Sequence, residues 1–215
     1  MKRLLAIIVS LVMVLSLTAC GGPSPTDVAD TFLTAIKEQN AESIAECYVN
    51  DEFDLFEEAS NAADGEDSDE DKEEEADDAL TKVYDENLVP KMLEFEYELS
   101  NEKIDEDKAT VDVSVTTYQL GSAFTSFFGE YLGQAFALAF SDTSDEQMSA
   151  LAANILTSKL DGLTEKTHQK TVALSLIKKD DKWVVDKVEG NKDVLNALSG
   201  GIVDAVSNMS TAFGE

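Results

Sequence analysis

Two neighbouring runs of alternating apolar and polar residues constrain the fold of this chain more than any other feature. The first run covers 93–100 and the second covers 109–117, with a polar turn over 101–108 between them. Successive side chains of a strand point to opposite faces of a sheet, so each run has one apolar face and one wet face. The two runs therefore predict an antiparallel β-hairpin that other elements cover on one face only.

A second hairpin is predicted near the C-terminus. The run 169–178 alternates in the same way, a charged turn follows at 179–182, and an apolar segment at 183–188 continues as the last strand. One face of the run 169–178 carries Val172, Leu174 and Leu176, and this is the face that we expect to meet the helices.

Apolar residues at helical spacing predict helices on both sides of the strands. These helices cover 24–39, 41–49, 80–88, 192–198 and 202–209. Ser24 is placed to cap the first helix, with Pro25 in its first turn. Pro90 follows the third helix and predicts a break or a kink there.

A helical hairpin is predicted over 121–162. Its first helix carries an aromatic stripe over 124–140, and Ser144 to Gln147 has the pattern of a capping box for the second helix. The opposite face of the first helix is polar, so we do not expect a membrane span. At this spacing the stripe predicts core packing, and any part left exposed would be an interface for a partner or a second copy.

The segment 57–78 is dominated by carboxylates and contains no large apolar residue. Such a segment cannot bury enough surface to offset the entropy of ordering it, so it predicts a disordered insert. Oxygen ligands alternate over 64–71, but an EF-hand loop begun at Asp67 has Lys72 where glycine is required and Asp78 where a bidentate glutamate is required. This pattern therefore indicates a solvated run of charge, with weak, diffuse association of cations as the alternative, and we assign no metal site.

The first 25 residues have the order of an export signal. Lys2 and Arg3 precede an apolar stretch over 4–17, which is shorter than the ~20 residues that span a bilayer. Leu17, Thr18, Ala19 and Cys20 follow and resemble the bacterial lipobox, in which a diacylglycerol is attached to the cysteine. The resemblance implies a signal peptide over 1–19, a lipid-anchored spacer over 20–25 and a single mature domain over 26–215.

Two acyl chains anchor a protein stably, so the lipid on Cys20 implies a location at the outer face of the cell membrane. The precursor has a formal net charge of -28; without Lys2 and Arg3, 14 basic residues remain against 44 acidic ones, which gives -30. This charge disfavours nucleic acid and leaves proteins or cationic cell-envelope components as partners. If Cys20 carries lipid, Cys47 has no cysteine to pair with and is expected to pack as a small apolar residue.

Four segments together resemble the lipobox-bearing lipoproteins of Firmicutes in a domain-of-unknown-function family near the nuclear transport factor 2 and cystatin-like superfamily. They are the lipobox at 17–20, TDVADTFLTAIKEQN from Thr26, DKATVDVSVTTY from Asp107, and KDDKWVVDKV from Lys179. The resemblance implies an α+β fold, with helices packed on a curved antiparallel sheet as in a cystatin-like cone. The acidic insert and the helical hairpin depart from the minimal cone and put a simple open pocket in doubt.

Candidates for chemistry are few. The one histidine, His168, lies among polar residues and is expected to be exposed at a strand edge. Tyr97 and Tyr118 could line a cone pocket, but their positions fit packing in the core or at its rim equally well. We assign no catalytic residue and no cofactor. The sequence favours a membrane-anchored, non-catalytic binding or assembly module; the alternative is a small-molecule binder or an isomerase- or dehydratase-like enzyme that uses a cone pocket.

Overall fold

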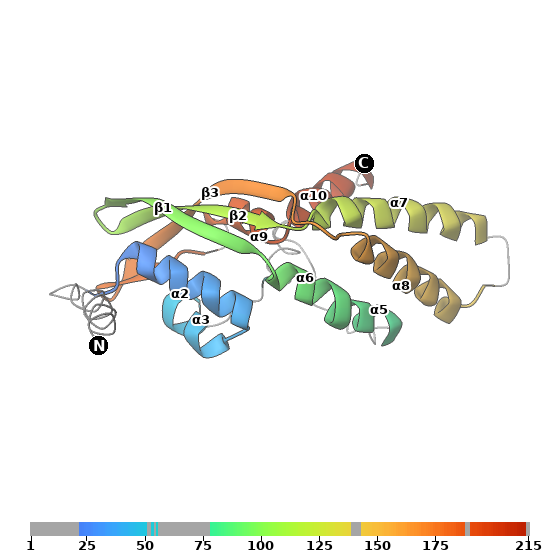
Figure 1. The fold of residues 1–215 in the computed structure, drawn as a ribbon, viewed down its shortest axis with the longest axis horizontal. Coiled ribbons are helices and arrows are strands. Elements are labelled where there is room, and N and C mark those ends of the chain that lie inside the picture. The colour runs from blue at the N-terminus through green and yellow to red at the C-terminus, as the bar shows by residue number, and fades with distance from the viewer. Residues whose placement is uncertain are drawn as a thin grey trace, which may run out of the picture.

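Four antiparallel strands form one sheet in their sequence order, and helices cover one of its faces and extend beyond one end (Figure 1). The structure is a computed structural model that describes residues 22–50, 53, 55, 78–138, 143–187 and 190–213. The strands are β1 Glu96–Asp105, β2 Lys108–Thr117, β3 His168–Lys179 and β4 Lys182–Val185. The predicted α+β class, with helices on a curved antiparallel sheet, is confirmed.

The first hairpin has the predicted alternation but a tighter turn. Along β2 the odd-numbered residues are buried, and Val111, Val113 and Val115 are at most 1% exposed. The turn predicted over 101–108 shortens to two residues, because β1 continues to Asp105 with a register shift between Ser100 and Lys103. The irregularity contains Asn101, which has a φ of 52° and donates a hydrogen bond of 2.9 Å to Asp112.

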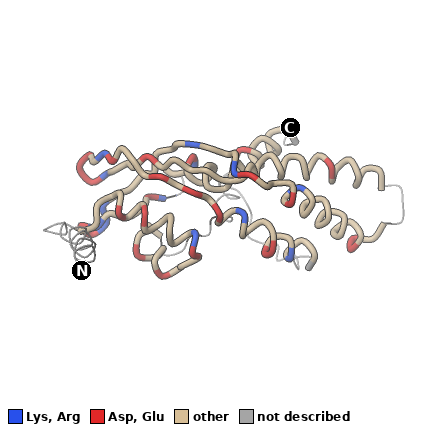
Figure 2. The backbone as a smooth tube through the Cα atoms, viewed as in Figure 1, with Lys and Arg blue, Asp and Glu red and all other residues tan. Residues whose placement is uncertain are grey.

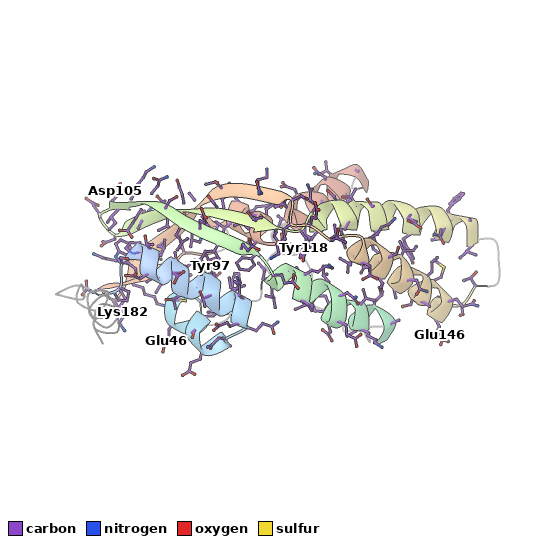
Figure 3. The ribbon with its side chains drawn as sticks, viewed as in Figure 1. Glu46, Tyr97, Asp105, Tyr118, Glu146 and Lys182 are labelled. Carbon is purple, nitrogen blue, oxygen red and sulfur yellow. The ribbon has the colours of Figure 1, made fainter. Side chains whose placement is uncertain are left out.

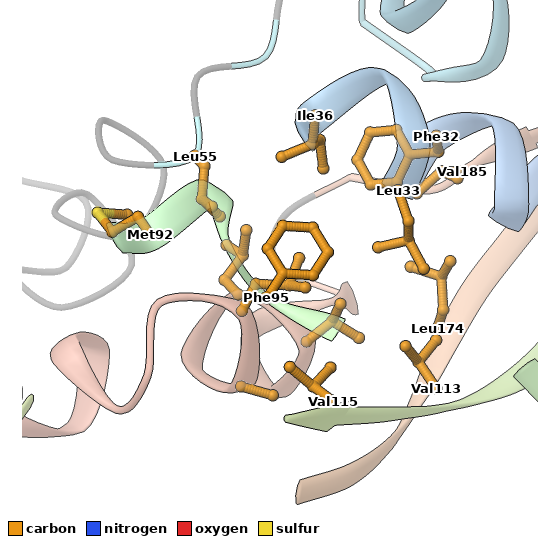
Figure 4. Close-up of a cluster of buried hydrophobic side chains, with 14 of the residues drawn as sticks. Phe32, Leu33, Ile36, Leu55, Met92, Phe95, Val113, Val115, Leu174 and Val185 are labelled. Carbon is orange, nitrogen blue, oxygen red and sulfur yellow. The ribbon is translucent and has the colours of Figure 1, made fainter. Parts of the chain in front are cut away.

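Two helices lie under the sheet at its start. Helix α2, Pro25–Glu38, begins with the predicted cap: Ser24 and Asp27 form a reciprocal capping box. Helix α3, Ala41–Cys47, is capped by Asn40. Figure 4 shows the apolar face of α2 pointing toward the strands.

The helical segment around Pro90 is continuous, so of the two predicted alternatives, a break and a kink, the break is wrong. Helix α5, Asp78–Val83, runs into a π-helical turn, η1 Tyr84–Leu88, and then into α6, Val89–Leu93. Proline has no N–H and its ring collides with the carbonyl four residues earlier, so a wider turn just before it removes the conflict. Asp78, assigned to the acidic insert, begins α5, and the rest of that insert lies outside the described residues.

The predicted helical hairpin is present as α7, Leu120–Leu138, and α8, Asp145–Asp161. Ser144 and Gln147 form the predicted capping box. The two helices lie side by side and project away from the sheet as an arm (Figure 1). Helix α10, Ile202–Phe213, packs on α7 near the base of the arm, and α9, Lys192–Leu198, packs on β3.

Three glycines fix the junction between arm and sheet. Gly200 and Gly201 have φ values of 62° and 90°, in the region where glycine is favoured. A Cβ on Gly121 would lie 2.2 Å from the carbonyl oxygen of Gly201. Gly121 also donates its backbone N–H to Gly200 at 3.0 Å, so α7 begins in direct backbone contact with the loop between α9 and α10.

Candidate functional site

One cavity lies between α2, α3 and the π-helical segment. It has a volume of about 190 Å³, and the side chains around it include Ile36, Ile44, Leu55 and Met92. Tyr84 is the ionisable side chain among its described lining residues. Proton transfer requires an acid or base whose pKa is tuned toward neutrality, and the described lining contains no carboxylate, histidine or lysine.

A wider hollow of about 440 Å³ crosses the outer face of β1, β2 and β3. Its floor carries hydroxyl groups, and those of Ser114 and Thr171 are hydrogen-bonded at 2.9 Å. Glu96 at its edge forms an ion pair of 2.8 Å with Lys166, which lowers the pKa of this exposed carboxyl. The hollow is therefore the solvated polar face of the sheet, rather than a pocket that excludes water.

Tyr97 is half-buried between β1 and α2 (Figure 3). Its hydroxyl donates to Asp30 at 2.9 Å and lies 2.8 Å from the hydroxyl of Thr34. Burial raises the pKa of Tyr97. Both partners belong to α2, so the described contacts of this side chain join a helix to the edge of the sheet.

Tyr118 joins three other segments. Its hydroxyl donates to Glu94 at 2.8 Å, and this bond raises the pKa of Tyr118. The amino group of Lys91 on α6 lies 4.5 Å from the ring centroid and also donates to the carbonyl of Leu163, beyond α8, at 3.0 Å. Lys166, the partner of Glu96, lies on the same ring at 6.0 Å. This cluster connects α6, the end of β2 and the chain after α8.

His168 is not the exposed strand-edge residue that the sequence predicts. Its Nε2 is buried and has no hydrogen-bond partner among the described residues, and the same holds for the hydroxyl of Thr117, directly opposite on β2. A Cβ on Gly201 would lie 3.4 Å from the ring, so the loop before α10 covers this end of β3. Burial lowers the pKa of His168, which favours the neutral imidazole.

Cys47 packs as a small apolar residue, as predicted. It is 5% exposed, and its S–H donates to the carbonyl of Ser43 at 3.0 Å. Burial raises the pKa of the thiol to about 11. At neutral pH the side chain therefore remains a thiol rather than a nucleophilic thiolate.

The lipobox residues Leu17, Thr18, Ala19 and Cys20 lie outside the described residues, so lipidation stays a prediction. The oxygen-rich window over 64–71 lies outside them too. Within the described ranges, no helix has the length and apolar character needed to cross a membrane. The same ranges contain no group of three or more histidine, cysteine or acidic side chains placed to hold a metal ion.

The aromatic stripe on α7 is less buried than predicted. Only the first turn of the helix is buried, whereas Leu132 is 40% exposed and Phe136 is 73% exposed. The rings of Phe127 and Tyr131 are stacked, with centroids 5.9 Å apart, and both are half-buried. Helices α8 and α10 cover part of α7, and no described element covers the outer side of the arm.

This outer side forms a continuous surface, which we call the α7 face. It consists of Ser122, Thr125, Ser126, Gly129, Leu132, Gly133 and Phe136, all of which are exposed. None of these residues is charged, and the one charged residue of α7, Glu130, pairs with Lys159 of α8. Figure 2 shows α7 almost free of the acidic residues that mark the sheet half of the molecule. The α7 face is the candidate functional site.

Comparison with known proteins adds little to the description of the structure. No family model matches the chain, and no curated protein matches it. One solved structure is similar, a candidate lipoprotein (ycdA) of Bacillus subtilis subsp. subtilis strain 168, with 17% sequence identity and a TM-score of 0.41. The match covers 57% of this chain and 38% of the other, so it spans well under half of that protein. The resemblance to the Firmicutes lipoprotein family stays a prediction.

Proposed function

We propose that the protein is a lipid-anchored, extracytoplasmic module that binds or assembles with other molecules and does not catalyse a reaction. The observation that carries this proposal is the α7 face, an exposed and uncharged surface on an arm that projects from the folded sheet. The ionisable side chains at the joints of the fold, such as Tyr97 and Tyr118, have partners from other elements and serve to hold those elements together.

The geometry suits an anchored module. Four residues lie between Cys20 and Pro25. The five steps of an extended chain from one to the other reach at most roughly 18 Å. A lipid on Cys20 would therefore hold the start of α2 close to the membrane. The α2 start and the tip of the arm lie at opposite ends of the long axis (Figure 1), so the α7 face remains accessible when the other end is tethered.

The charge of the molecule restricts its partners. With a net charge of -30 after removal of the signal peptide, the molecule repels anionic lipid headgroups and attracts cationic components of the cell envelope. The α7 face, which has no charge, suits an uncharged protein surface.

A small-molecule binder is the second candidate, and the cavity beside Ile36 and Met92 supports it. Its volume of about 190 Å³ is below the ~300 Å³ at which ligand pockets usually begin. The larger hollow on the sheet is polar and open. For this reason we place binding through the α7 face first.

Metabolic labelling with palmitate in cells that produce the full chain tests the anchor. We expect label on the wild-type protein and its recovery in the membrane fraction, and we expect Cys20→Ser to lose both, because that thiol is the predicted attachment point. Cys47→Ser is the matched control, since its buried thiol should leave labelling unchanged. Label retained by Cys20→Ser would refute the anchored module.

A further inference from the structure

We propose that the α7 face binds the same face of a second copy of this chain, with the two helices antiparallel. The inference deepens the proposed function, because it names the partner of the same surface. Four observations support it: the absence of charge on the face, the satisfaction of its hydroxyl groups, its small residues at heptad spacing, and the match between its two ends.

The charge of the molecule limits where two copies can meet. Two molecules that each carry -28 or more repel each other strongly wherever their acidic surfaces meet. The α7 face has no charge, and the nearby carboxylate of Glu130 is compensated by Lys159. Self-association therefore costs least in electrostatic energy at this surface.

Two hydroxyl groups of the face already have partners within the helix. The hydroxyl of Thr125 donates to the carbonyl of Gly121 at 2.9 Å, and that of Ser126 donates to Ser122 at 2.8 Å. Burying an unsatisfied hydroxyl is costly, whereas burying one that keeps its hydrogen bond is not. This part of the face can be covered by another helix without losing those bonds.

The small residues allow a close approach. One row along the α7 face, which we call the seam, repeats at intervals of four, three, four and three residues. This is the spacing at which helices pair. The seam consists of Ser122, Ser126, Gly129, Gly133 and Phe136. A Cβ on Gly129 or Gly133 would meet nothing within 4 Å, so open space lies over both glycines. A second helix can therefore approach the backbone of α7 at the centre of the face.

The two ends of the seam are complementary only when the helices are antiparallel. A two-fold axis between Gly129 and Gly133 places Gly129 of one copy opposite Gly133 of the other. The same axis places the small Ser126 opposite the large Phe136 in two symmetric layers. A parallel pair would instead set Phe136 against Phe136 and Ser126 against Ser126. A large side chain packed against a small one fills each layer to the same extent, which favours the antiparallel arrangement.

The arrangement agrees with a lipid anchor at the other end of each molecule. In an antiparallel pair the two anchored ends point in opposite directions along the long axis. When the two-fold axis is normal to the membrane, both lipids reach the same bilayer. The contact of one helix pair is small, and confinement to a membrane raises the effective concentration that holds such a pair together.

Disulfide trapping in membranes of cells that produce the full chain tests the register. One copy carries Ser126→Cys, and a second, differently tagged copy carries Phe136→Cys. In the mixed dimer the two cysteines face each other in one layer, and the unchanged Phe136 and Ser126 face each other in the other layer. We expect an oxidant to trap a mixed dimer with both tags. Each variant alone should give none, because ten residues of helix separate the like positions by roughly 15 Å.

A trapped dimer from Ser126→Cys alone, or no mixed dimer from the pair, would overturn the proposal. Leu132→Glu, added to both copies, should abolish trapping by burying two like charges, whereas Asn154→Glu, an equal change of charge at an exposed site on α8, should leave it intact. If Leu132→Glu and Asn154→Glu reduced trapping of the mixed dimer equally, the cause would be general charge repulsion instead of a contact on α7. Palmitate labelling of the same samples separates the two hypotheses, since labelled protein without the mixed dimer sinks only the pairing.

Discussion

The sheet half and the arm of this molecule are built on different principles. In the sheet half, the faces of α2 and the strands meet in a core whose largest members, such as Leu33, Phe95 and Leu174, have no exposed surface. In the arm, α7 buries only its first turn, and most of its apolar side chains are half-buried or exposed. The comparison indicates that a fully buried core holds the sheet half together, while α7 offers surface.

The way in which the halves are joined supports this division. Hydrogen bonds and cation–π contacts connect the helices of the arm to the end of the sheet. They are made by Tyr118, Lys91 and Lys166. Gly121 and Gly201 are in close backbone contact at the same junction. These contacts set the direction of the arm without covering its outer side, so an exposed surface is held by a rigid base.

The largest expected difference between the halves concerns the same substitution at two leucines. Leu33→Ala should lower the free energy of unfolding by about 2–5 kcal/mol, because it removes a fully buried side chain and leaves a cavity. Leu132→Ala should cost below about 1 kcal/mol, because that side chain is already 40% exposed. Urea unfolding followed by circular dichroism measures both, and equal losses would contradict the division.

A glycine pair sharpens the comparison with effects of opposite sign. Gly121→Ala should lower the free energy of unfolding by about 2 kcal/mol or more, because its Cβ would collide with the backbone of Gly201. Gly129→Ala should raise it by about 0.5–1 kcal/mol, because alanine favours an exposed helix and meets open space there. Thermal unfolding at a low protein concentration, where copies do not pair, reads both changes. A destabilising Gly129→Ala would show that the face is already covered within the monomer.

Local sequence patterns predicted the helices and strands of both halves better than they predicted which side chains are covered. The alternation of Val111, Val113 and Val115 and the cap at Ser24 depend on neighbours in the chain, and the structure has both where they were expected. The burial of His168 and the exposure of Phe136 were missed, because each depends on which distant element covers it. Helical spacing shows which face of α7 is apolar. It contains no information on whether another helix lies over that face.

The smallest expected effect is a dependence on pH at the junction of the halves. The lowered pKa of His168 means that, below its ordinary value of 6.5, the unfolded chain binds a proton more readily than the folded chain. Stability should therefore fall as the pH drops from about 7 through 6 toward the lowered folded pKa. Asp204 opposes the shift and Lys170 adds to it. His168→Gln should flatten this slope, and unfolding midpoints of both proteins between pH 5 and 8 test it. If the stability of the two proteins changed with pH along parallel slopes, the pH dependence would come from carboxylates instead of His168.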